Sequence, residues 1–219
     1  MKITFIGHAC FLCESEQGLR ILLDPYKPLA FDGRIALKPF EEKVDIVAST
    51  HNHLDHFYID KKMGTPVIVK GSGIFLGVEF RALKLPHGSE TGREAGFVTG
   101  LRFELDGISL FHPGDLGRVL TEAEAKFIGN VDILLLPVGG TWTIGPSEAI
   151  DLISILRPKV AIPMHYYMEK VVDLRLRPLS DFLTLVGAFE ECPSHSVVFL
   201  RSSLPPPTKV LVLKAKNAF

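Results

Sequence analysis

Three histidines and one aspartate lie within six residues of one another: His51, His53, Asp55 and His56. The apolar run Val44–Ser49 directly precedes them and predicts a buried β-strand that ends at the cluster. Alternate residues of an extended chain face the same side, so His51 and His53 can reach one metal ion. Once the chain turns, Asp55 and His56 can reach an adjacent position. A polar surface loop is the alternative, and four potential ligands in six residues disfavour it.

The composition is that of an ordinary globular chain, which predicts one ordered domain over residues 1–219. Hydrophobic residues make up 47% of the chain and charged residues 22%. The formal net charge of −1 gives no global basic field that would recruit nucleic acid. No apolar run approaches the roughly 18 residues of a membrane span.

The three cysteines form no disulfide framework, which favours a reducing cytoplasm. Cys10 and Cys13 lack the second pair that a structural zinc site needs.

The spacing of apolar residues and the positions of turn-forming residues predict strands in the first half of the chain. In the second half they predict strands interleaved with helices. The predicted strands are Lys2–Ile6, Phe11–Glu14, Arg20–Asp24, Val44–Ser49, Pro66–Lys70, Phe80–Leu85, Phe97–Leu105, Ile108–Phe111, Val131–Pro137, Lys159–Pro163, Val197–Leu200 and Lys209–Lys214. The predicted helices are Glu122–Ile128, Ser147–Leu156 and Leu179–Phe189. Asp106-Gly107 is a hairpin turn signal, and Thr121 can cap the first helix. The last strand is expected at an exposed edge or terminus.

This order of elements favours mixed sheets covered by helices over a doubly wound sheet. Two other kinds of site are disfavoured by their motifs. Gly71-Ser72-Gly73 hints at a nucleotide-binding loop, but Gly77 comes one residue too late for the third glycine. A G-x-S-x-G elbow for serine-based hydrolysis is absent from the sequence.

The sequence resembles the metallo-β-lactamase superfamily, whose H-x-H-x-D-H motif is matched by His51, His53, Asp55 and His56. Further segments are similar to the branch that contains ascorbate-6-phosphate lactonase and related uncharacterised hydrolases. These segments are Gly7-His8, Leu23-Asp24-Pro25, Phe111-His112-Pro113-Gly114-Asp115, Leu136-Pro137-Val138-Gly139-Gly140 and Ile162-Pro163-Met164-His165-Tyr166.

The resemblance implies an α/β (α+β) fold, a four-layer αββα sandwich of two mixed β-sheets flanked by helices. It also implies two divalent metal ions, expected to be zinc with manganese or iron as alternatives. The first metal would be held by His51, His53 and His87, the second by Asp55, His56 and His165, and the carboxylate of Asp115 would bridge both.

Taken singly, the remote ligands have simpler explanations. His87 could be a loop residue, with His112 as the competing candidate ligand. Asp115 in Pro113-Gly114-Asp115 could be a turn aspartate, and His165 could be a core histidine. The complete cluster and the matching order of the segments favour ligation for all three.

Other polar residues are expected around the ligands, because metal-binding imidazoles usually donate their second N–H to a carboxylate or carbonyl. The candidates for this supporting role are Asp24, His8, Thr50 and His112. A turn before Pro25 is an equally good explanation of Asp24, and His8 is expected to be buried and structural.

Candidate substrate-binding residues follow the strands of the second half. Trp142, the single tryptophan, lies in a loop that borders the expected cleft, and Tyr166 follows a ligand. For both, packing in the core is the alternative. Arg175 and Arg177 alternate and could face one anionic group, although a solvated strand face explains them better.

The predicted function is a dinuclear metal-dependent hydrolase. A metal-bridging hydroxide would attack a phosphoester, or a lactone or other carbonyl ester, of a small anionic substrate. Asp55 is expected to orient that nucleophile or pass on its proton. The alternative is a non-catalytic metal-binding or oligomeric scaffold that retains the metal site. The sequence leaves homo-oligomerisation open.

Overall fold

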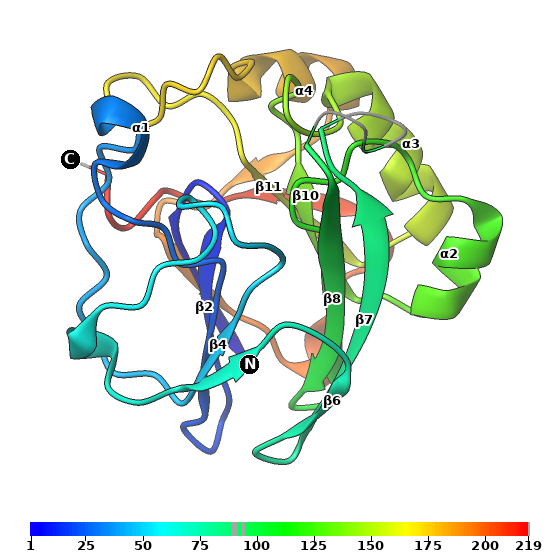
Figure 1. Cartoon of the computed structure of the whole chain (residues 1–219). Helices are drawn as coiled ribbons and strands as arrows, with labels where there is room; N and C mark the ends of the chain where they lie inside the picture. Colours follow the sequence, from blue (N-terminus) through cyan, green and yellow to red (C-terminus); the bar gives the residue numbers. More distant parts are fainter. Residues whose placement is uncertain (89–91, 93–94, 219) are drawn as a thin grey trace.

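In the computed structural model, which describes residues 1–88, 92 and 95–218, two mixed β-sheets pack face to face (Figure 1). The six-stranded sheet has the order β13 (Ser196–Val198), β1 (Lys2–Gly7), β2 (Cys10–Glu14), β3 (Arg20–Leu23), β4 (Ile46–Ala48), β5 (Val67–Val69). The eight-stranded sheet has the order β12 (Glu190–Glu191), β14 (Lys209–Val212), β11 (Val160–Met164), β10 (Ile133–Pro137), β9 (Ile108–His112), β8 (Phe97–Leu105), β7 (Val78–Pro86), β6 (Gly73–Phe75).

Alternate residues of the six-stranded sheet divide between two apolar clusters, as the pleat of a strand requires. In β2, Phe11 and Cys13 face the core between the sheets, whereas Cys10 and Leu12 face the outer side. The outer side is covered mainly by loop residues: Tyr26, Ile35, Leu37, Phe40, Val44 and Val172. Both faces of this sheet are therefore buried, and the thiols of Cys10 and Cys13 have no exposed surface.

Three helices cover the outer face of the eight-stranded sheet; two of them lie on the right of Figure 1 and the third at the top. They are α2 (Glu122–Ile128), α3 (Pro146–Leu156) and α4 (Leu179–Val186). Ala149 and Leu152 of α3 and Phe182 of α4 are fully buried against that sheet's apolar cluster. The short elements α1 (Ala30–Gly33), η1 (Lys61–Met63) and η2 (Arg201–Ser203) lie in the connecting segments. The predicted fold class, two mixed sheets flanked by helices, is confirmed.

The structure confirms the predicted hairpin turn at Asp106-Gly107 and the predicted helix cap at Thr121. Asp106 and Gly107 have φ values of 52° and 71° and join β8 to β9, as a type I′ hairpin turn requires. The side chain of Thr121 accepts from the backbone N–H of Glu124, and Glu124 completes the capping box of α2.

Two predictions about the end of the chain are wrong. The final strand, β14, lies between β11 and β12 instead of at an edge, and Val210 and Leu211 are buried. The helix predicted to reach Phe189 ends at Val186, because Gly187 takes a φ of 73° and its N–H caps the carbonyl of Leu183.

Strand direction brings several loops to one end of the molecule. In the six-stranded sheet, β1, β3 and β4 run in the same direction, and in the other sheet β7, β9, β10 and β11 do so. The described residues that directly follow these strands therefore meet at the upper end of the two sheets in Figure 1. Over the described residues, the structure contains no helix that is both long and apolar enough to cross a membrane.

Candidate metal centre

The His/Asp cluster of the sequence lies in a tight turn directly after β4. The N–H groups of His56 and Phe57 donate to the carbonyl of His53, at 2.9 and 2.8 Å. Ser49 Oγ lies 2.7 Å from the carbonyl oxygen of His51 and 3.0 Å from that of His56. The serine hydroxyl thus ties the two ends of the turn together and fixes the directions in which its imidazoles point.

One group of ligand atoms comes from His51, His53 and His87. Nδ1 of His53 lies 3.1 Å from Nε2 of His51 and 3.3 Å from Nε2 of His87, which follows β7. Asp115, after β9, places Oδ2 at 4.0 Å from Nε2 of His51 and 3.9 Å from Nε2 of His87.

A second group comes from Asp55, His56 and His165, together with His8, whose ligand atom lies within 4.8 Å of the other three. Nε2 of His56 lies 3.4 Å from Oδ2 of Asp55. Oδ1 of Asp115 lies 3.2 Å from Nε2 of His56 and 3.2 Å from Nε2 of His165, which follows β11. The two carboxylate oxygens of Asp115 therefore face one group each.

These separations fit a shared metal ion. With metal–nitrogen bonds of about 2.0–2.1 Å, tetrahedral ligand atoms lie about 3.3 Å apart. Several atoms of the second group are buried and have no hydrogen-bond partner among the described residues: Asp55 Oδ1, His56 Nε2, Asp115 Oδ1 and His165 Nε2. Unpartnered buried polar atoms are costly unless something binds them. The cluster is able to bind metal.

The protonation states of His51 and Asp115 suit metal binding. Burial lowers the pKa of His51 to about 3, so its imidazole is neutral at pH 7. Burial would raise the pKa of Asp115, but the imidazoles of His165 and His56 outweigh it and hold the pKa well below its usual range. Against the effect of burial, the surrounding carboxylates raise the pKa of His56 well above its ordinary value. The surplus of carboxylate charge around His56 attracts a cation.

Asp24, after β3, is fully buried behind the cluster and is connected to two of its histidines. Its Oδ2 accepts from Nδ1 of His56 at 2.8 Å and from Oγ1 of Thr50 at 2.7 Å, and its Oδ1 accepts from the N–H of Thr50 at 2.7 Å. Thr50 Oγ1 also lies 3.0 Å from Nδ1 of His51. His112 contacts Asp24, with Nε2 at 3.0 Å from Oδ2, and not Asp115. Asp24 thereby orients His56 directly and His51 through Thr50.

His8, after β1, contacts the second group from the other side. Its Nε2 lies 3.1 Å from Oδ2 of Asp55, and its ring centroid lies 4.2 Å from that of His165. The carbonyl of His8 accepts from the N–H of His165 at 2.9 Å. Burial lowers the pKa of His8 to about 4, so this imidazole is neutral at pH 7.

Two glycines are required by close approach in this region. A Cβ on Gly114, whose φ is 62°, would lie 2.6 Å from Oγ1 of Thr50. A Cβ on Gly139 would lie 2.1 Å from the carbonyl oxygen of His165. These contacts bring Asp115 and His165 up to the loop after β4.

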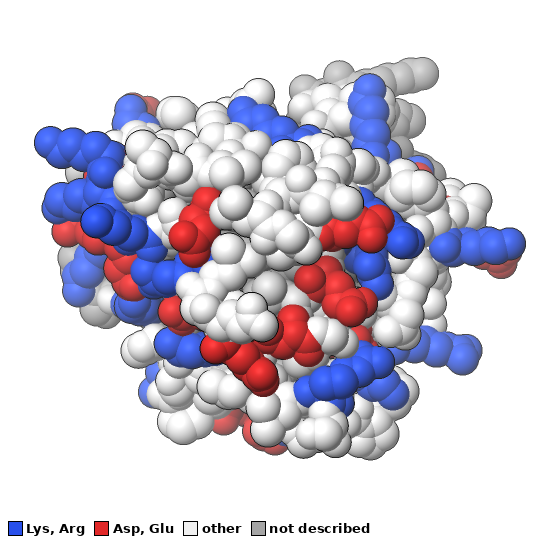
Figure 2. Space-filling view, turned by 90° about the horizontal axis from the view of Figure 1, so that it is seen from below, with Lys and Arg blue, Asp and Glu red and all other residues white. Residues whose placement is uncertain are grey.

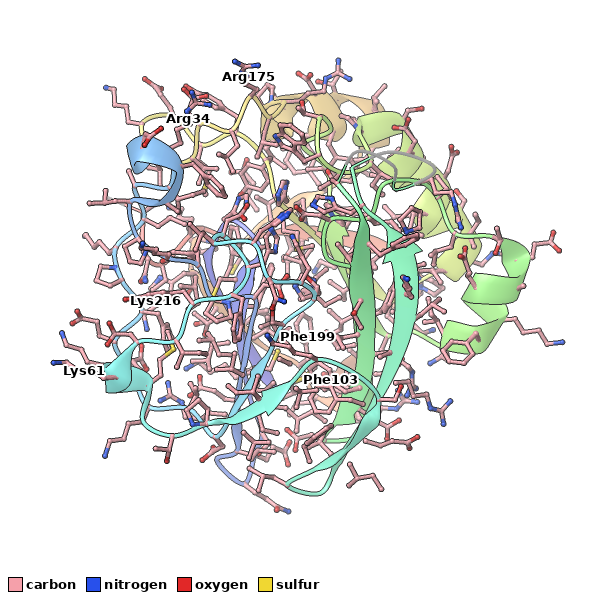
Figure 3. The ribbon with its side chains drawn as sticks, in the orientation of Figure 1. Arg34, Lys61, Phe103, Arg175, Phe199 and Lys216 are labelled. Atoms are coloured by element: carbon pink, nitrogen blue, oxygen red, sulfur yellow. The ribbon has the colours of Figure 1, made fainter. Side chains whose placement is uncertain are left out.

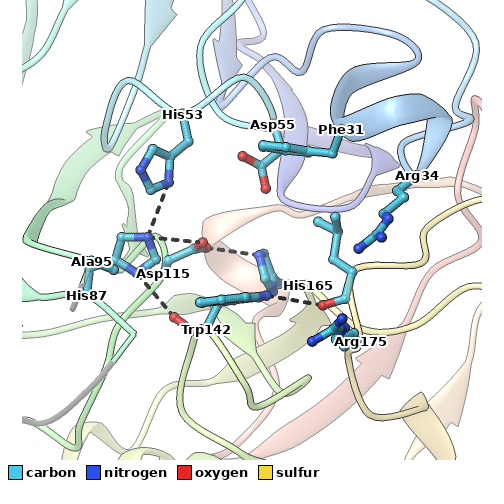
Figure 4. Close-up of a pocket in the computed structure, with 11 residues that line it drawn as sticks. Phe31, Arg34, His53, Asp55, His87, Ala95, Asp115, Trp142, His165 and Arg175 are labelled. Atoms are coloured by element: carbon cyan, nitrogen blue, oxygen red, sulfur yellow. Dashed lines mark hydrogen bonds and ion pairs between the residues drawn. The ribbon is translucent and has the colours of Figure 1, made fainter.

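A pocket of about 600 Å³ opens over the two ligand groups (Figure 4). It is lined by Phe31, Arg34, His53, Asp55, His87, Ala95, Asp115, Trp142, His165, Leu174 and Arg175. The indole Nε1 of Trp142 donates to the carbonyl of Leu174 at 3.1 Å, and the carbonyl of Trp142 lies 3.1 Å from Nδ1 of His87. Trp142 is thus both a wall of the pocket and a support for one of the clustered histidines.

Tyr166 does not line this pocket. Its side chain is buried in the core between the sheets, with its ring centroid 6.3 Å from that of Phe5, and burial raises the pKa of its hydroxyl. Arg175 and Arg177 also separate: Arg175 lines the pocket, whereas Nε of Arg177 pairs with Asp181 at 3.0 Å.

Sequence reasoning missed Phe31 and Arg34 in the pocket wall. They lie in the irregular segment after Pro25, which carries no motif; the N–H of Lys27 in this segment donates to the carbonyl of Leu54 at 2.6 Å, and Ile35 forms a bridge with Val172. No local signal in the sequence identifies them.

Comparison with known proteins places the chain in a family. Residues 2–165 match the model of a family described as a β-lactamase superfamily domain. A UPF0173 metal-dependent hydrolase from Carboxydothermus hydrogenoformans is 34% identical over an alignment of 209 residues that covers 83% of this chain and 91% of that protein.

Solved structures agree with this relationship. A Thermotoga maritima protein, described as a candidate Zn-dependent hydrolase of the metallo-β-lactamase superfamily, superposes with a TM-score of 0.76 at 32% identity, covering 97% of this chain and 99% of that one. Igni18, a metallo hydrolase from Ignicoccus hospitalis, superposes with a TM-score of 0.62 at 25% identity, covering 98% and 95%. The chain therefore belongs to the metallo-β-lactamase superfamily, within the family of UPF0173 metal-dependent hydrolases.

Proposed function

We propose that this protein is a dinuclear metal-dependent hydrolase that cleaves a phosphoester, or a lactone or other carbonyl ester, of a small anionic substrate. The observation that carries the proposal is the position of Asp115, with one carboxylate oxygen toward each group of ligand atoms. In this assignment, one metal is held by His51, His53 and His87, the other by Asp55, His56 and His165, and Asp115 bridges the two metals. Histidine and carboxylate ligands favour zinc, with manganese and iron as alternatives.

When bound, the two metals supply a water nucleophile at neutral pH and polarise the carbonyl or phosphoryl oxygen of the substrate. The chain's own residues position these components. Asp24 holds the imidazoles of His56 and, through Thr50, of His51. His8 holds Oδ2 of Asp55, and Oδ1 of the same carboxylate is left without a hydrogen-bond partner among the described residues. Asp55 lines the pocket, so this free oxygen can orient the nucleophile or accept its proton.

The pocket supports a small-molecule substrate. Its volume of about 600 Å³ lies within the range of about 300–1,000 Å³ that is typical of small-ligand sites. The resemblance to the lactonase branch favours lactones and phosphorylated small molecules.

We also propose that residues 1–219 form one domain, because residues from both sheets and from α3 and α4 share one apolar cluster. The buried thiols of Cys10 and Cys13 support the proposal of a reducing, cytoplasmic environment.

The test uses metal-free protein reconstituted separately with zinc and with manganese. Hydrolysis of bis(4-nitrophenyl) phosphate and of 4-nitrophenyl butyrate is then followed at 400 nm, together with the metal content. We expect turnover of at least one substrate that requires metal and is lost in Asp115→Ala. Asp151→Asn, which changes an exposed carboxylate of α3, is the matched control and keeps turnover.

The outcome distinguishes a hydrolase from a non-catalytic metal-binding scaffold. If protein with two bound metals hydrolyses neither these esters nor a panel of lactones and phosphorylated esters, the hydrolase proposal fails. The alternative, a metal-binding or oligomeric scaffold, then becomes the better explanation.

A further inference from the structure

Two arginines line the pocket, and their side chains make no contact that stabilises the fold through an ion pair or hydrogen bond among the described residues. Arg34 and Arg175 are both exposed, and Figure 4 shows them on the side of the pocket that lies across from His53 and His87. Over the described part of the chain, neither guanidinium has an ion pair or hydrogen bond. Figure 3 places both side chains at the same end of the molecule.

The backbone holds the two arginines in place through contacts between distant segments. The carbonyl of Arg34 accepts a hydrogen bond from the N–H of Asp173 at 3.0 Å. The N–H of Ala36 donates to the carbonyl of Val171 at 2.7 Å. Ile35 and Val172 form an isolated bridge between these hydrogen bonds. The segments that carry Arg34 and Arg175 are therefore joined as a small two-stranded unit.

A second set of contacts fixes Arg175 relative to the tryptophan. Oγ1 of Thr141 donates to the carbonyl of Arg175 at 2.8 Å, and the indole of Trp142 donates to the carbonyl of Leu174. Arg175 has a φ of 59°, a left-handed conformation that costs energy for a residue with a side chain. Such conformations persist where the surrounding structure enforces them, and they are frequent at ligand sites.

The positive charge at this position is local. The whole chain has a formal net charge of −1, and the opposite end of the molecule, seen from below in Figure 2, gathers acidic side chains near its centre. Arg177, two residues from Arg175, is neutralised by Asp181, so the pocket receives one unpaired arginine from this segment and one from the segment of Arg34. Guanidinium groups bind carboxylates and phosphates through paired hydrogen bonds.

We propose that Arg34 and Arg175 bind an anionic group of the substrate, a carboxylate or a phosphate, that is separate from the bond cleaved at the metal centre. Trp142 and Phe31, 44% and 40% exposed, supply apolar surface for the carbon skeleton between the two ends. This inference rests on the proposed function and narrows its substrate class. The substrate is an ester whose scissile group faces the histidines and whose remote oxyanion faces the arginines.

The kinetic test compares three esters with the same four-carbon acyl chain on the zinc-loaded protein. 4-Nitrophenyl butyrate is neutral, whereas mono-4-nitrophenyl glutarate adds a terminal carboxylate; 4-nitrophenyl 4-phosphonobutyrate replaces that carboxylate by a phosphonate. We expect the ratio of kcat/KM for each anionic ester to that for the butyrate to fall about tenfold in Arg34→Gln and in Arg175→Gln. The anionic ester with the larger fall identifies the preferred oxyanion. The matched control, Arg177→Gln, leaves both ratios unchanged. Ratios that remain at the wild-type value in both pocket variants would overturn the proposal.

A second readout is independent of hydrolysis. Because Trp142 is the single tryptophan of the chain and lines the pocket, its fluorescence reports on ions that enter there. Iodide is an anionic quencher and acrylamide a neutral one. We expect the ratio of iodide to acrylamide quenching to fall about twofold in the Arg34→Gln/Arg175→Gln double variant. An unchanged ratio would contradict anion binding by the arginines, even if the esters show no turnover and the proposed function itself fails.

Discussion

The carboxylate of Asp24 accepts a hydrogen bond from Nδ1 of His56 at 2.8 Å, and both side chains are fully buried. This contact leaves Nε2 of His56 directed at the carboxylates of Asp55 and Asp115. The imidazoles of His112 and His56 outweigh the effect of burial and hold the pKa of Asp24 below its ordinary value. Asp24 is therefore ionised throughout the physiological range and holds the imidazole of His56 in this orientation.

Replacing Asp24 tests this supporting role. Asp24→Asn keeps the shape of the side chain but removes the charge that orients His56 and Thr50. We expect zinc affinity to fall about 10- to 100-fold, measured by competition with a chromogenic chelator. Asp151→Asn, on the exposed face of α3, should bind zinc like the wild type. Equal affinities for Asp24→Asn and the wild type would contradict the account.

Asp55 is the second target. Its Oδ1 is buried and has no hydrogen-bond partner among the described residues, so it can accept the proton of the nucleophile. Asp55→Ala should lower kcat by about 10²- to 10⁴-fold. The metal content is measured on the same sample, because the proposed ligand role predicts weaker binding at one position as well. Full turnover with both metals bound would exclude a proton-transfer role.

Gly114 is predicted to tolerate alanine less well than an ordinary turn glycine, because two effects combine there. A Cβ would meet Oγ1 of Thr50 at 2.6 Å, and the φ of 62° is itself unfavourable for other residues. The matched control is Gly107→Ala: Gly107 has a φ of 71° but has nothing within 4 Å of its Cβ position. We expect Gly107→Ala to lower the free energy of unfolding by about 1 kcal/mol and Gly114→Ala by at least about 1 kcal/mol more. Urea denaturation measures both, and equal losses would show that the contact with Thr50 is unimportant.

A pH-dependent contribution to stability is expected at the start of α2. The guanidinium of Arg118, together with the hydrogen bonds from Thr121, lowers the pKa of Glu124 from its ordinary 4.5 to about 2. A carboxyl with a lowered pKa in the folded state stabilises the protein above its ordinary pKa, and this contribution disappears as the pH falls from 4.5 toward 2. Because both side chains are half-buried and water still screens the pair, the contribution is about 1 kcal/mol.

Glu124→Gln should therefore destabilise the protein by about 1 kcal/mol at pH 6, and by progressively less as the pH approaches 3. The free energy of unfolding is measured for both proteins at each pH. Glu122→Gln removes a charge from the same helical turn without removing the capping box and serves as the control. A difference between Glu124→Gln and wild type that does not change with pH would contradict the lowered pKa.

Parts of this structure could be predicted because the deciding interactions are local. The turn at Asp106-Gly107 needs only the residues of the turn itself, which tolerate positive φ values. The cap of α2 lies within four residues, from Thr121 to Glu124. The fold class followed from the order of strands and helices and from the resemblance. The histidine cluster was visible because its members are adjacent in sequence.

Other parts depend on contacts between distant segments. The sequence predicts the final strand at an exposed edge or terminus, yet a two-residue strand, β12, pairs with the far side of β14. Nothing within Glu190–Glu191 indicates a strand, since both residues are exposed and charged. Arg34 and Arg175 are another example, because the bridge between Ile35 and Val172 brings their segments together. The sequence predicts Tyr166 as a substrate-binding residue because it follows His165, but its side chain packs in the core between the sheets.

The zinc stoichiometry of the chain tests the dinuclear site most directly. Metal-free protein is saturated with zinc, and bound zinc is counted by inductively coupled plasma mass spectrometry, for the wild type and for Asp115→Ala. If Asp115 bridges two metal positions, the wild type binds about two zinc ions per chain and Asp115→Ala binds about one or fewer. Saturation of the wild type at one zinc ion, or retention of two by folded Asp115→Ala, would contradict the dinuclear site.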